Sequence, residues 1–424
     1  MRKRLFILLL FIILPKCNKN TIDFCNECCF AKVVDLTGCL SSRCHSFHAR
    51  LDVEEYGINP PSVFESNGKN YDVGYPFKFS RKAFKDTNIK GAAEGWPFGR
   101  CFYDANNDLI CVCVTEAEGH IDSPNVGAAY FKCKHPFEEW SEFYKIADNA
   151  DGVGKRVHSA NILPDGSYIA IVCHKQASGS VDGTMHVYRS SDNGITWTDN
   201  GAIKIDGTDL QGDIMCPLYV ASGGRLLSAI NRGSKIGTAN HFYMYSDDNG
   251  KTWNRANGLQ IHHFEPEFVT IENTIFAVCR SKTDDYPVLY YSDDNGSSWT
   301  KGGYFMLRSF SSPISITKMD GRFLVVCADR IPNKTGHFEV KVAFLNETYF
   351  PKTGNSKEIK ASVVCQSIAV HDNNNACGDF GYVHTVCTDK GQLFCYYYDR
   401  TPAHENGGET AWFELVGNVL FDNK

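Results

Sequence analysis

The feature that most constrains the fold is an eight-residue turn sequence that occurs three times. The copies are "SSDNGITW" (Ser190–Trp197), "SDDNGKTW" (Ser246–Trp253) and "SDDNGSSW" (Ser292–Trp299). They recur roughly every 50 residues, and a period of that length is typical of propellers and solenoid arrays. The sequence therefore predicts that one supersecondary unit is repeated along the chain.

A second recurring element is an apolar run, a Gly- or Asp-containing turn and another apolar run, which is the pattern of a β-hairpin. It occurs six times, over residues 99–114, 159–174, 216–232, 265–280, 312–330 and 382–400. Third runs such as "MHVYRS", "HFYMYS" and "VLYYS" follow, and then the turn sequence and a fourth short strand. We predict an all-β fold, a six-bladed β-propeller of four-stranded antiparallel blades over residues 91–424. A β-sandwich is the alternative, but it does not explain the period.

The repeated turn consists of residues that stabilise turns. Ser and Asp side chains can bind backbone N–H groups of their own turn, Gly250 supplies an unusual backbone conformation, and Trp253 offers a large packing face. A calcium loop is the alternative, but the ligand Glu of an EF-hand is absent at the required offset. We therefore interpret the turn as scaffold.

The N-terminus has the pattern of a secretory signal. Arg2, Lys3 and Arg4 precede an apolar run over residues 5–14, which is too short for a stable membrane anchor. We expect a signal peptide over 1–20 and a secreted protein; a buried N-terminal helix is the alternative. Residues 21–90 are predicted to form a Cys-containing lead-in.

The 18 cysteines are compatible with export. Five crowd the lead-in and predict a disulfide-stapled segment, with a metal knot as the less favoured alternative. Another five end apolar runs and are predicted to be small core residues: Cys113, Cys173, Cys279, Cys327 and Cys395.

The net charge of −6 is mild, and no basic stripe favours nucleic acid.

The strand topology of a blade predicts where a ligand would bind. In a four-stranded antiparallel blade, the start of strand one and the end of strand two share a face, opposite the repeated turn. The polar residues predicted at that face are Glu265, Arg280, Arg330, Tyr382, Tyr398, Arg400, Arg156, His158, His174, Asp213, Arg232, His120 and Asp122. An arginine-rich ring with acids and a tyrosine suits an anionic sugar, because Arg pairs with a carboxylate in a two-pronged fashion.

The repeated turn resembles the Asp-box of the sialidase superfamily, also called the BNR repeat, S-x-D-x-G-x-T-W, with Ser298 in place of Thr in the third copy. The segments "FEPEFVTIENTIFAVCRS", "SPISITKMDGRFLVVCADR" and "GDFGYVHTV" are similar to sialidase segments. The resemblance implies Tyr382 as nucleophile, Glu265 as the base that takes its proton, and Arg280 and Arg330 as ligands of the sugar carboxylate. Arg156, His158 and Arg232 are further candidate substrate-binding residues.

The resemblance also has departures. The arginine of the R-I-P motif expected in the first blade is missing, and "EGWPFGRCF" stands there. The acid/base role falls to Asp122 or His120 in "EGHIDS". We expect a secreted glycosidase that removes terminal sialic acid or a related acidic sugar, without a metal or other cofactor. An endo-acting polysialic-acid enzyme, a non-catalytic carbohydrate-binding propeller and another propeller glycosidase or lyase remain alternatives.

Overall fold

In the computed structural model the chain divides into two compact units, residues 1–47 and 48–424. The structure describes these residues, all in the second unit: 63–66, 69–73, 77–79, 95–96, 101–104, 106, 108–115, 127–134, 139–140, 144–175, 183–213, 216–230, 241–258, 264–281, 286–305, 313–319, 322–329, 338–353, 366–371, 380–387, 393–399 and 414–422. Within them no helix has the length and apolar character needed to cross a bilayer.

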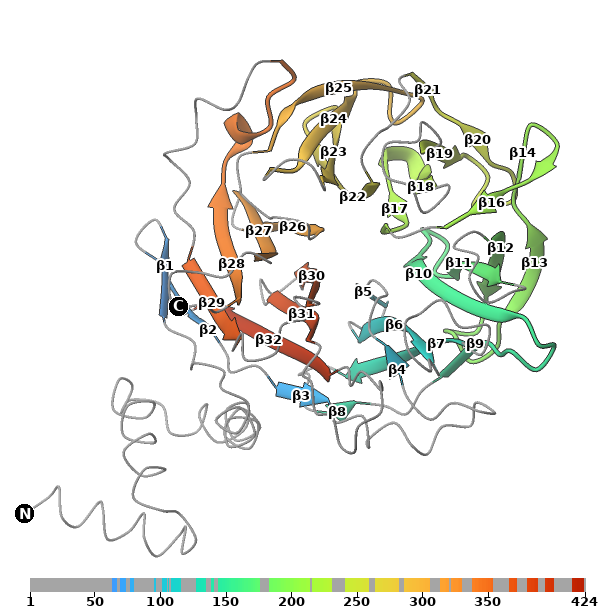
Figure 1. The fold of residues 1–424 in the computed structure, drawn as a ribbon, viewed down its shortest axis with the longest axis horizontal. Coiled ribbons are helices and arrows are strands. Elements are labelled where there is room, and N and C mark those ends of the chain that lie inside the picture. The colour runs from blue at the N-terminus through green and yellow to red at the C-terminus, as the bar shows by residue number, and fades with distance from the viewer. Residues whose placement is uncertain are drawn as a thin grey trace, which may run out of the picture. The chain divides into compact units, whose positions relative to one another are not determined.

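Almost all regular structure is β, in six larger sheets that follow one another in chain order around a common centre (Figure 1). We number these sheets 1 to 6. Sheet 1 contains β4 (Gly95–Trp96), β5 (Cys101–Tyr103), β6 (Leu109–Thr115), β7 (Gly127–Lys134), β8 (Glu139–Trp140) and β9 (Tyr144–Ala147). Sheet 2 contains β10 (Gly154–Ile162), β11 (Tyr168–Lys175), β12 (Gly183–Ser190), β13 (Thr198–Ala202) and β16 (Gln211–Gly212). Sheet 3 contains β17 (Tyr219–Val220), β18 (Leu226–Ile230), β19 (Phe242–Ser246) and β20 (Asn254–Arg255).

The second half of the chain continues the pattern. Sheet 4 contains β21 (Asn257–Gly258), β22 (Phe264–Ile271), β23 (Thr274–Arg280), β24 (Val288–Ser292) and β25 (Ser298–Tyr304). Sheet 5 contains β26 (Ile314–Met319), β27 (Arg322–Asp329), β28 (Phe338–Leu345) and β29 (Gln366–His371). Sheet 6 contains β30 (Phe380–Cys387), β31 (Leu393–Asp399) and β32 (Glu414–Asp422), joined by β1 (Val63–Ser66), β2 (Lys69–Val73) and β3 (Phe77–Phe79). A small hairpin of β14 (Lys204–Ile205) and β15 (Thr208–Asp209) and two 3₁₀ turns, Ser222–Gly224 and Glu347–Tyr349, complete the described elements.

All six predicted hairpins are present as antiparallel pairs: β5–β6, β10–β11, β17–β18, β22–β23, β26–β27 and β30–β31. The prediction of four strands in every unit is wrong in detail. Sheets 3 and 5 have four strands, whereas sheets 2 and 4 have five and sheets 1 and 6 have six. The additional strands are mostly short edge pieces, whose few residues leave no strong period-two pattern in the sequence.

The predicted lead-in contributes three of those strands. In sheet 6, β2 and β3 both pair with β32, near the C-terminal end of the chain, and β1 extends the edge. Segments far apart in the sequence therefore complete one sheet. The boundary placed at residue 91 stays a prediction.

The predicted hairpins of neighbouring sheets lie close together. β10 contacts β6, β22 contacts β18 and β26, and β30 contacts both β26 and β5. The apolar cores lie between neighbouring sheets; one cluster joins sheets 1 and 2, another joins sheets 2, 3 and 4, and a third joins sheets 4 and 5. A middle strand such as β23 is covered on both faces, and every residue of "TIFAVCR" is buried. That is why such strands are apolar throughout and not alternating.

The repeated turn holds its own loop together. Ser246 Oγ donates to Asp248 Oδ1 at 2.8 Å and accepts from the Gly250 N–H at 2.9 Å. Asp248 also accepts from the backbone and hydroxyl of Thr252, and Trp253 Nε1 donates to the Gly250 carbonyl at 3.1 Å. Gly250 adopts φ +83°, a left-handed value that favours glycine. The side chains of the turn thus satisfy the turn itself, as the scaffold interpretation predicts.

Each copy also binds the preceding sheet through a backbone carbonyl that accepts a hydrogen bond from a side chain there. The bonds run from Tyr130 to Gly194, from Arg189 to Asn249 and from Arg225 to Asn295. The repeated turns therefore fasten neighbouring sheets 1 to 4 at the end opposite the candidate site. The core prediction is confirmed for Cys173, Cys279 and Cys327, which are buried; the side chains of Cys113 and Cys395 lie outside the description.

Candidate functional site

The candidate site lies where the first strand of a sheet starts and the second ends. In sheet 4 these two positions hold Glu265, on β22, and Arg280, on β23. Arg280 Nη1 donates to Glu265 Oε2 at 2.7 Å, and both side chains are buried. Two residues predicted separately as base and carboxylate ligand therefore form one ion pair.

A β-bulge places the Glu265 side chain. Phe264 pairs with Arg280 and Pro266 with Cys279, so Glu265 is the additional residue of the bulged strand. Its φ is +52°, which is uncommon for a residue with a side chain. Strained backbone of this kind is concentrated at functional sites, and bulges re-aim side chains next to them.

A second buried ion pair belongs to sheet 2. Arg156 lies near the start of β10, and its Nη2 forms an ion pair with Asp213 Oδ2. Asp213 directly follows β16. Arg156 is 1% exposed, so the guanidinium is held inside the protein. Lys155 and Lys175 are also buried at this end of the sheet, and Lys155 Nζ donates to Asp151 at 2.7 Å. This end of sheet 2, predicted to bind an anionic ligand, therefore holds buried cations, of which Arg156 and Lys155 are each paired with a carboxylate.

A polar network that the sequence did not indicate joins three first strands. Thr385 on β30 contacts Ser315 on β26, with 2.9 Å between the hydroxyl oxygens, and its N–H donates to Ser315 Oγ at 2.9 Å. Ser315 Oγ also donates to Glu267 Oε1, on β22, at 3.5 Å. Glu267 follows Glu265 by two positions on the same strand. That spacing was the one sequence signal that could have identified Glu267 as part of the site. The network connects the strand of Glu265 with the strand that carries Tyr382.

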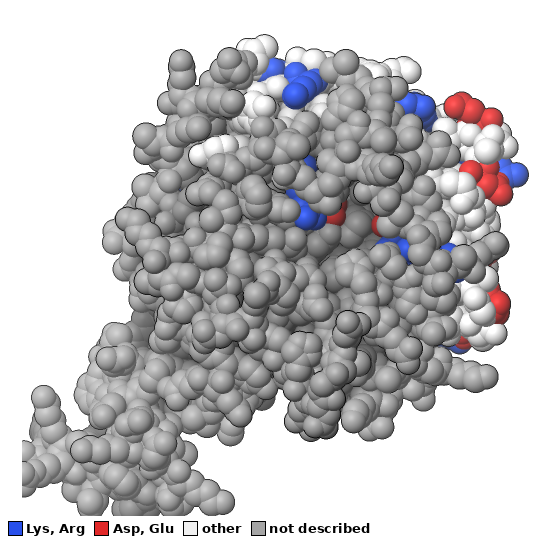
Figure 2. Space-filling view, viewed as in Figure 1, with Lys and Arg blue, Asp and Glu red and all other residues white. Residues whose placement is uncertain are grey.

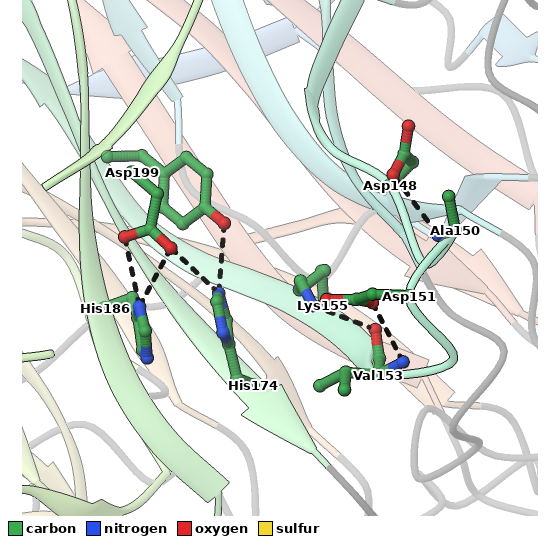
Figure 3. A network of polar contacts seen from close by, with 9 residues as sticks. Asp148, Ala150, Asp151, Val153, Lys155, His174, His186 and Asp199 are labelled. Atoms are coloured by element: carbon green, nitrogen blue, oxygen red, sulfur yellow. Dashed lines mark hydrogen bonds and ion pairs between the residues drawn. The ribbon is translucent and has the colours of Figure 1, made fainter. Parts of the chain in front are cut away.

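A third group of polar residues lies on β11, β12 and β13 of sheet 2 (Figure 3). The imidazoles of His174 and His186 stack with ring centroids 3.6 Å apart. Asp199 lies 3.0 Å from His186 Nδ1, and the Tyr188 hydroxyl lies 3.1 Å from His174 Nε2. Burial, followed by the nearby His186 and Lys155, lowers the pKa of His174 to about 4. The sequence indicated His174, but nothing local marked His186 or Asp199.

The remaining predicted residues are not placed by the structure. His120, Asp122, Arg232 and Arg330 lie outside the described residues. His158 lies on β10 and Tyr382 on β30, but their side chains lie outside the description. The structure therefore brings Glu265 and Arg280 together, pairs Arg156 with Asp213, and leaves the roles of the other candidates as predictions.

In the face shown in Figure 2, acidic and basic side chains of the described residues meet in a recess near the middle. An arrangement of arginines compensated by carboxylates can bind a ligand that carries both a carboxylate and hydroxyl groups, because each charged group accepts or donates directional hydrogen bonds. The groups available here for acid–base chemistry are carboxylates and imidazoles.

Comparisons with known proteins agree with the fold. The family model described as "BNR repeat-like domain" matches residues 116–352, more than half of the chain. No sequence among curated proteins matches. A protein of unknown function from Dyadobacter fermentans is 17% identical with a TM-score of 0.59, over 78% of this chain and 95% of that one.

Sialidase structures are also similar. Trypanosoma rangeli sialidase is 14% identical with a TM-score of 0.53, over 85% of this chain and 57% of its own. The NanB sialidase of Streptococcus pneumoniae, as its K499G mutant, is 11% identical with a TM-score of 0.52, over 76% of this chain and 67% of its own. At such identities the likeness concerns the fold. With three Asp-boxes and a family match over more than half its length, the chain belongs to the BNR-repeat, sialidase-like superfamily.

Proposed function

We propose that this protein is a secreted glycoside hydrolase of the sialidase type, built as a six-bladed β-propeller, that removes terminal sialic acid or a related acidic sugar. The observation that carries the proposal is the buried pair of Glu265 and Arg280 at a strained bulge. A carboxylate and a guanidinium at that position are the residue types required to activate a nucleophile and to bind a sugar carboxylate.

The proposed mechanism has two steps. The Tyr382 oxygen attacks the anomeric carbon while Glu265 takes the hydroxyl proton, and Asp122 or His120 gives a proton to the departing glycosidic oxygen. Water then attacks the same carbon and gives a proton to Asp122 or His120, while Glu265 returns its proton to the departing Tyr382 oxygen; this releases the sugar and restores every group to its starting state. Arg280 and Arg330 bind the substrate carboxylate. A neutral tyrosine suits this substrate, because an anionic nucleophile would be repelled by that carboxylate.

A non-catalytic carbohydrate-binding propeller is the second candidate. Two observations favour it: the R-I-P arginine of the first blade is missing from the sequence, and Arg280 is already neutralised by Glu265. A lectin requires cationic groups for the sugar but no activated tyrosine.

The test is to incubate the full-length protein with sialyl-lactose and, separately, with polysialic acid, and to identify the products by mass. Free sialic acid from sialyl-lactose that disappears in Tyr382→Phe supports the proposal. Short oligomers from polysialic acid alone would replace it with an endo-acting enzyme. Binding of either glycan without any product would replace it with the lectin.

A further inference from the structure

The best-supported additional site is on sheet 2, where His174, His186 and Asp199 come together. The possible ligand atoms of these three side chains all lie within 4.8 Å of one another. They come from three adjacent strands, β11, β12 and β13, and Figure 3 shows the three side chains grouped beside the β-sheet.

The strand register explains why the group forms. Val172 pairs with His186, so His174, two residues further along β11, is the diagonal neighbour of His186 on the same face. Tyr188 pairs with Asp199 across the next two strands, and that pair is again two residues from His186. Because side chains two apart on a strand share a face, all three metal-ligating residues project from one side of the sheet.

The charges around the group favour a cation. Lys155, the lysine that acts on His174, is paired with Asp151 at 2.7 Å and so has its own carboxylate. Among the described residues, Asp199 forms ion pairs only with the two imidazoles, at 3.0 Å from His186 and 4.0 Å from His174. When the imidazoles are neutral, the group carries the negative charge of Asp199.

The group is also accessible. The side chains of His174, His186 and Asp199 are 14%, 20% and 35% exposed. An ion can therefore reach them from solvent, while the partial burial limits how far the ligands can move. Zinc sites with three protein ligands keep a fourth coordination position for water. The exposed side of this group would leave room for such a water.

We propose that His174, His186 and Asp199 form a binding site for a divalent transition-metal ion of the zinc class. Two imidazole nitrogens and one carboxylate oxygen are ligands that Zn²⁺ and its neighbours in the first transition row accept, whereas Mg²⁺ and Ca²⁺ prefer oxygen alone. The ion would connect three strands of sheet 2 at the end that also holds Arg156. The site is independent of the proposed glycosidase chemistry, which requires no metal.

Binding involves one small rearrangement. The two rings are stacked with an interplanar angle of 13°, so the lone pairs of their nitrogens lie in nearly parallel planes. A metal bound by both requires the rings to splay and the His174–Tyr188 hydrogen bond of 3.1 Å to lengthen. Ring rotation about χ2 is broad and inexpensive.

The experiment is calorimetric titration of the full-length, metal-stripped protein with ZnCl₂, with CoCl₂ as a spectroscopic probe. The variants are His186→Gln and Asp199→Asn, and Asp209→Asn, at an exposed position of the β14–β15 hairpin, is the matched control. We expect one Zn²⁺ site that weakens by more than about tenfold in each of the first two variants and is unchanged in the control. Zn²⁺ should raise the Tm of the wild-type protein more than that of those variants.

Three results would overturn the proposal. The first is a titration that is the same in the wild type and in both site variants, because the ion would then be bound elsewhere. The second is a variant-sensitive Co²⁺ spectrum with strong thiolate charge transfer, because the ligands would then include cysteine. The third is equally strong binding of Ca²⁺ or Mg²⁺ at this site, which would make it a hard-cation site.

Discussion

Arg280 Nη1 lies 2.7 Å from Glu265 Oε2, and the bulge at Glu265 turns the carboxylate toward this arginine at the open end of the β22–β23 hairpin. Both side chains are almost completely buried. The ion pair therefore stabilises both buried charges, because burial removes the hydration of each charge and the opposite charge compensates for that loss.

We expect Glu265→Gln to lower the free energy of unfolding by about 3 kcal/mol, since it removes the carboxylate charge that pairs with the buried Arg280 guanidinium. Urea denaturation followed by fluorescence measures this. The double variant Glu265→Gln, Arg280→Met should recover part of the loss. If the single and double variants are equally destabilised, the two side chains are not energetically coupled.

Replacing the turn glycine Gly250 should reveal how the Asp-box packs on the preceding sheet. A Cβ at Gly250 would lie 2.5 Å from Ile169 Cδ1, whereas a Cβ at Gly166, with a similar φ of +80°, meets nothing within 4 Å. We expect Gly166→Ala to cost about 1–2 kcal/mol for the left-handed backbone alone. Gly250→Ala should cost about 1–3 kcal/mol more for the steric overlap. Equal losses in chemical denaturation would show that the turn does not pack against sheet 2 as described.

The network of Glu267, Ser315 and Thr385 should stabilise the contact between first strands. Thr385→Val removes the hydroxyl from a buried hydrogen bond to Ser315 and is expected to cost about 1–2 kcal/mol. Thr385→Ser retains the hydroxyl and is the matched control, with a loss below about 1 kcal/mol for the missing methyl group. Urea midpoints distinguish them, and a larger loss in the serine variant would mean that packing outweighs the hydrogen bond.

Acid should destabilise the protein through His174. Its pKa of about 4 in the folded protein is below the ordinary value of 6.5, so the unfolded chain takes up the proton first as the pH falls. The contribution of His174 to the free energy of unfolding is therefore fully present above about pH 6.5 and is lost progressively as the pH falls to about 4. The charged or titratable groups facing it are His186, Asp199, Tyr188, Asp151 and Lys155.

The check is the Tm of the wild type and of His174→Gln in the presence of a chelator, from pH 7.5 to pH 4.5. The wild type should lose more stability over this range than the variant, whose glutamine does not titrate. Parallel curves for the two proteins would remove His174 as the cause.

Much of the fold could be predicted from the sequence, because its signals are local. The turn at Ser246–Trp253 is stabilised by hydrogen bonds within eight residues, and the alternation of apolar runs with Gly or Asp turns marks each hairpin. These interactions do not depend on the rest of the chain. The six hairpins and the scaffold role of the Asp-box could therefore be read correctly, and the same topology placed Glu265 and Arg280 at one end of a sheet.

The contacts of the candidate sites were decided only by the tertiary structure. Arg156 meets Asp213, 57 positions away, and Ser315 meets Thr385, 70 positions away. Asp199 comes beside His174 and His186 through the register of three strands. A bulge such as that at Glu265 changes which side chain faces inward, and adjacent sheets bring together residues from separate repeats. Neither leaves a local pattern, because the energy of these contacts arises from burial and charge pairing after the sheets have assembled.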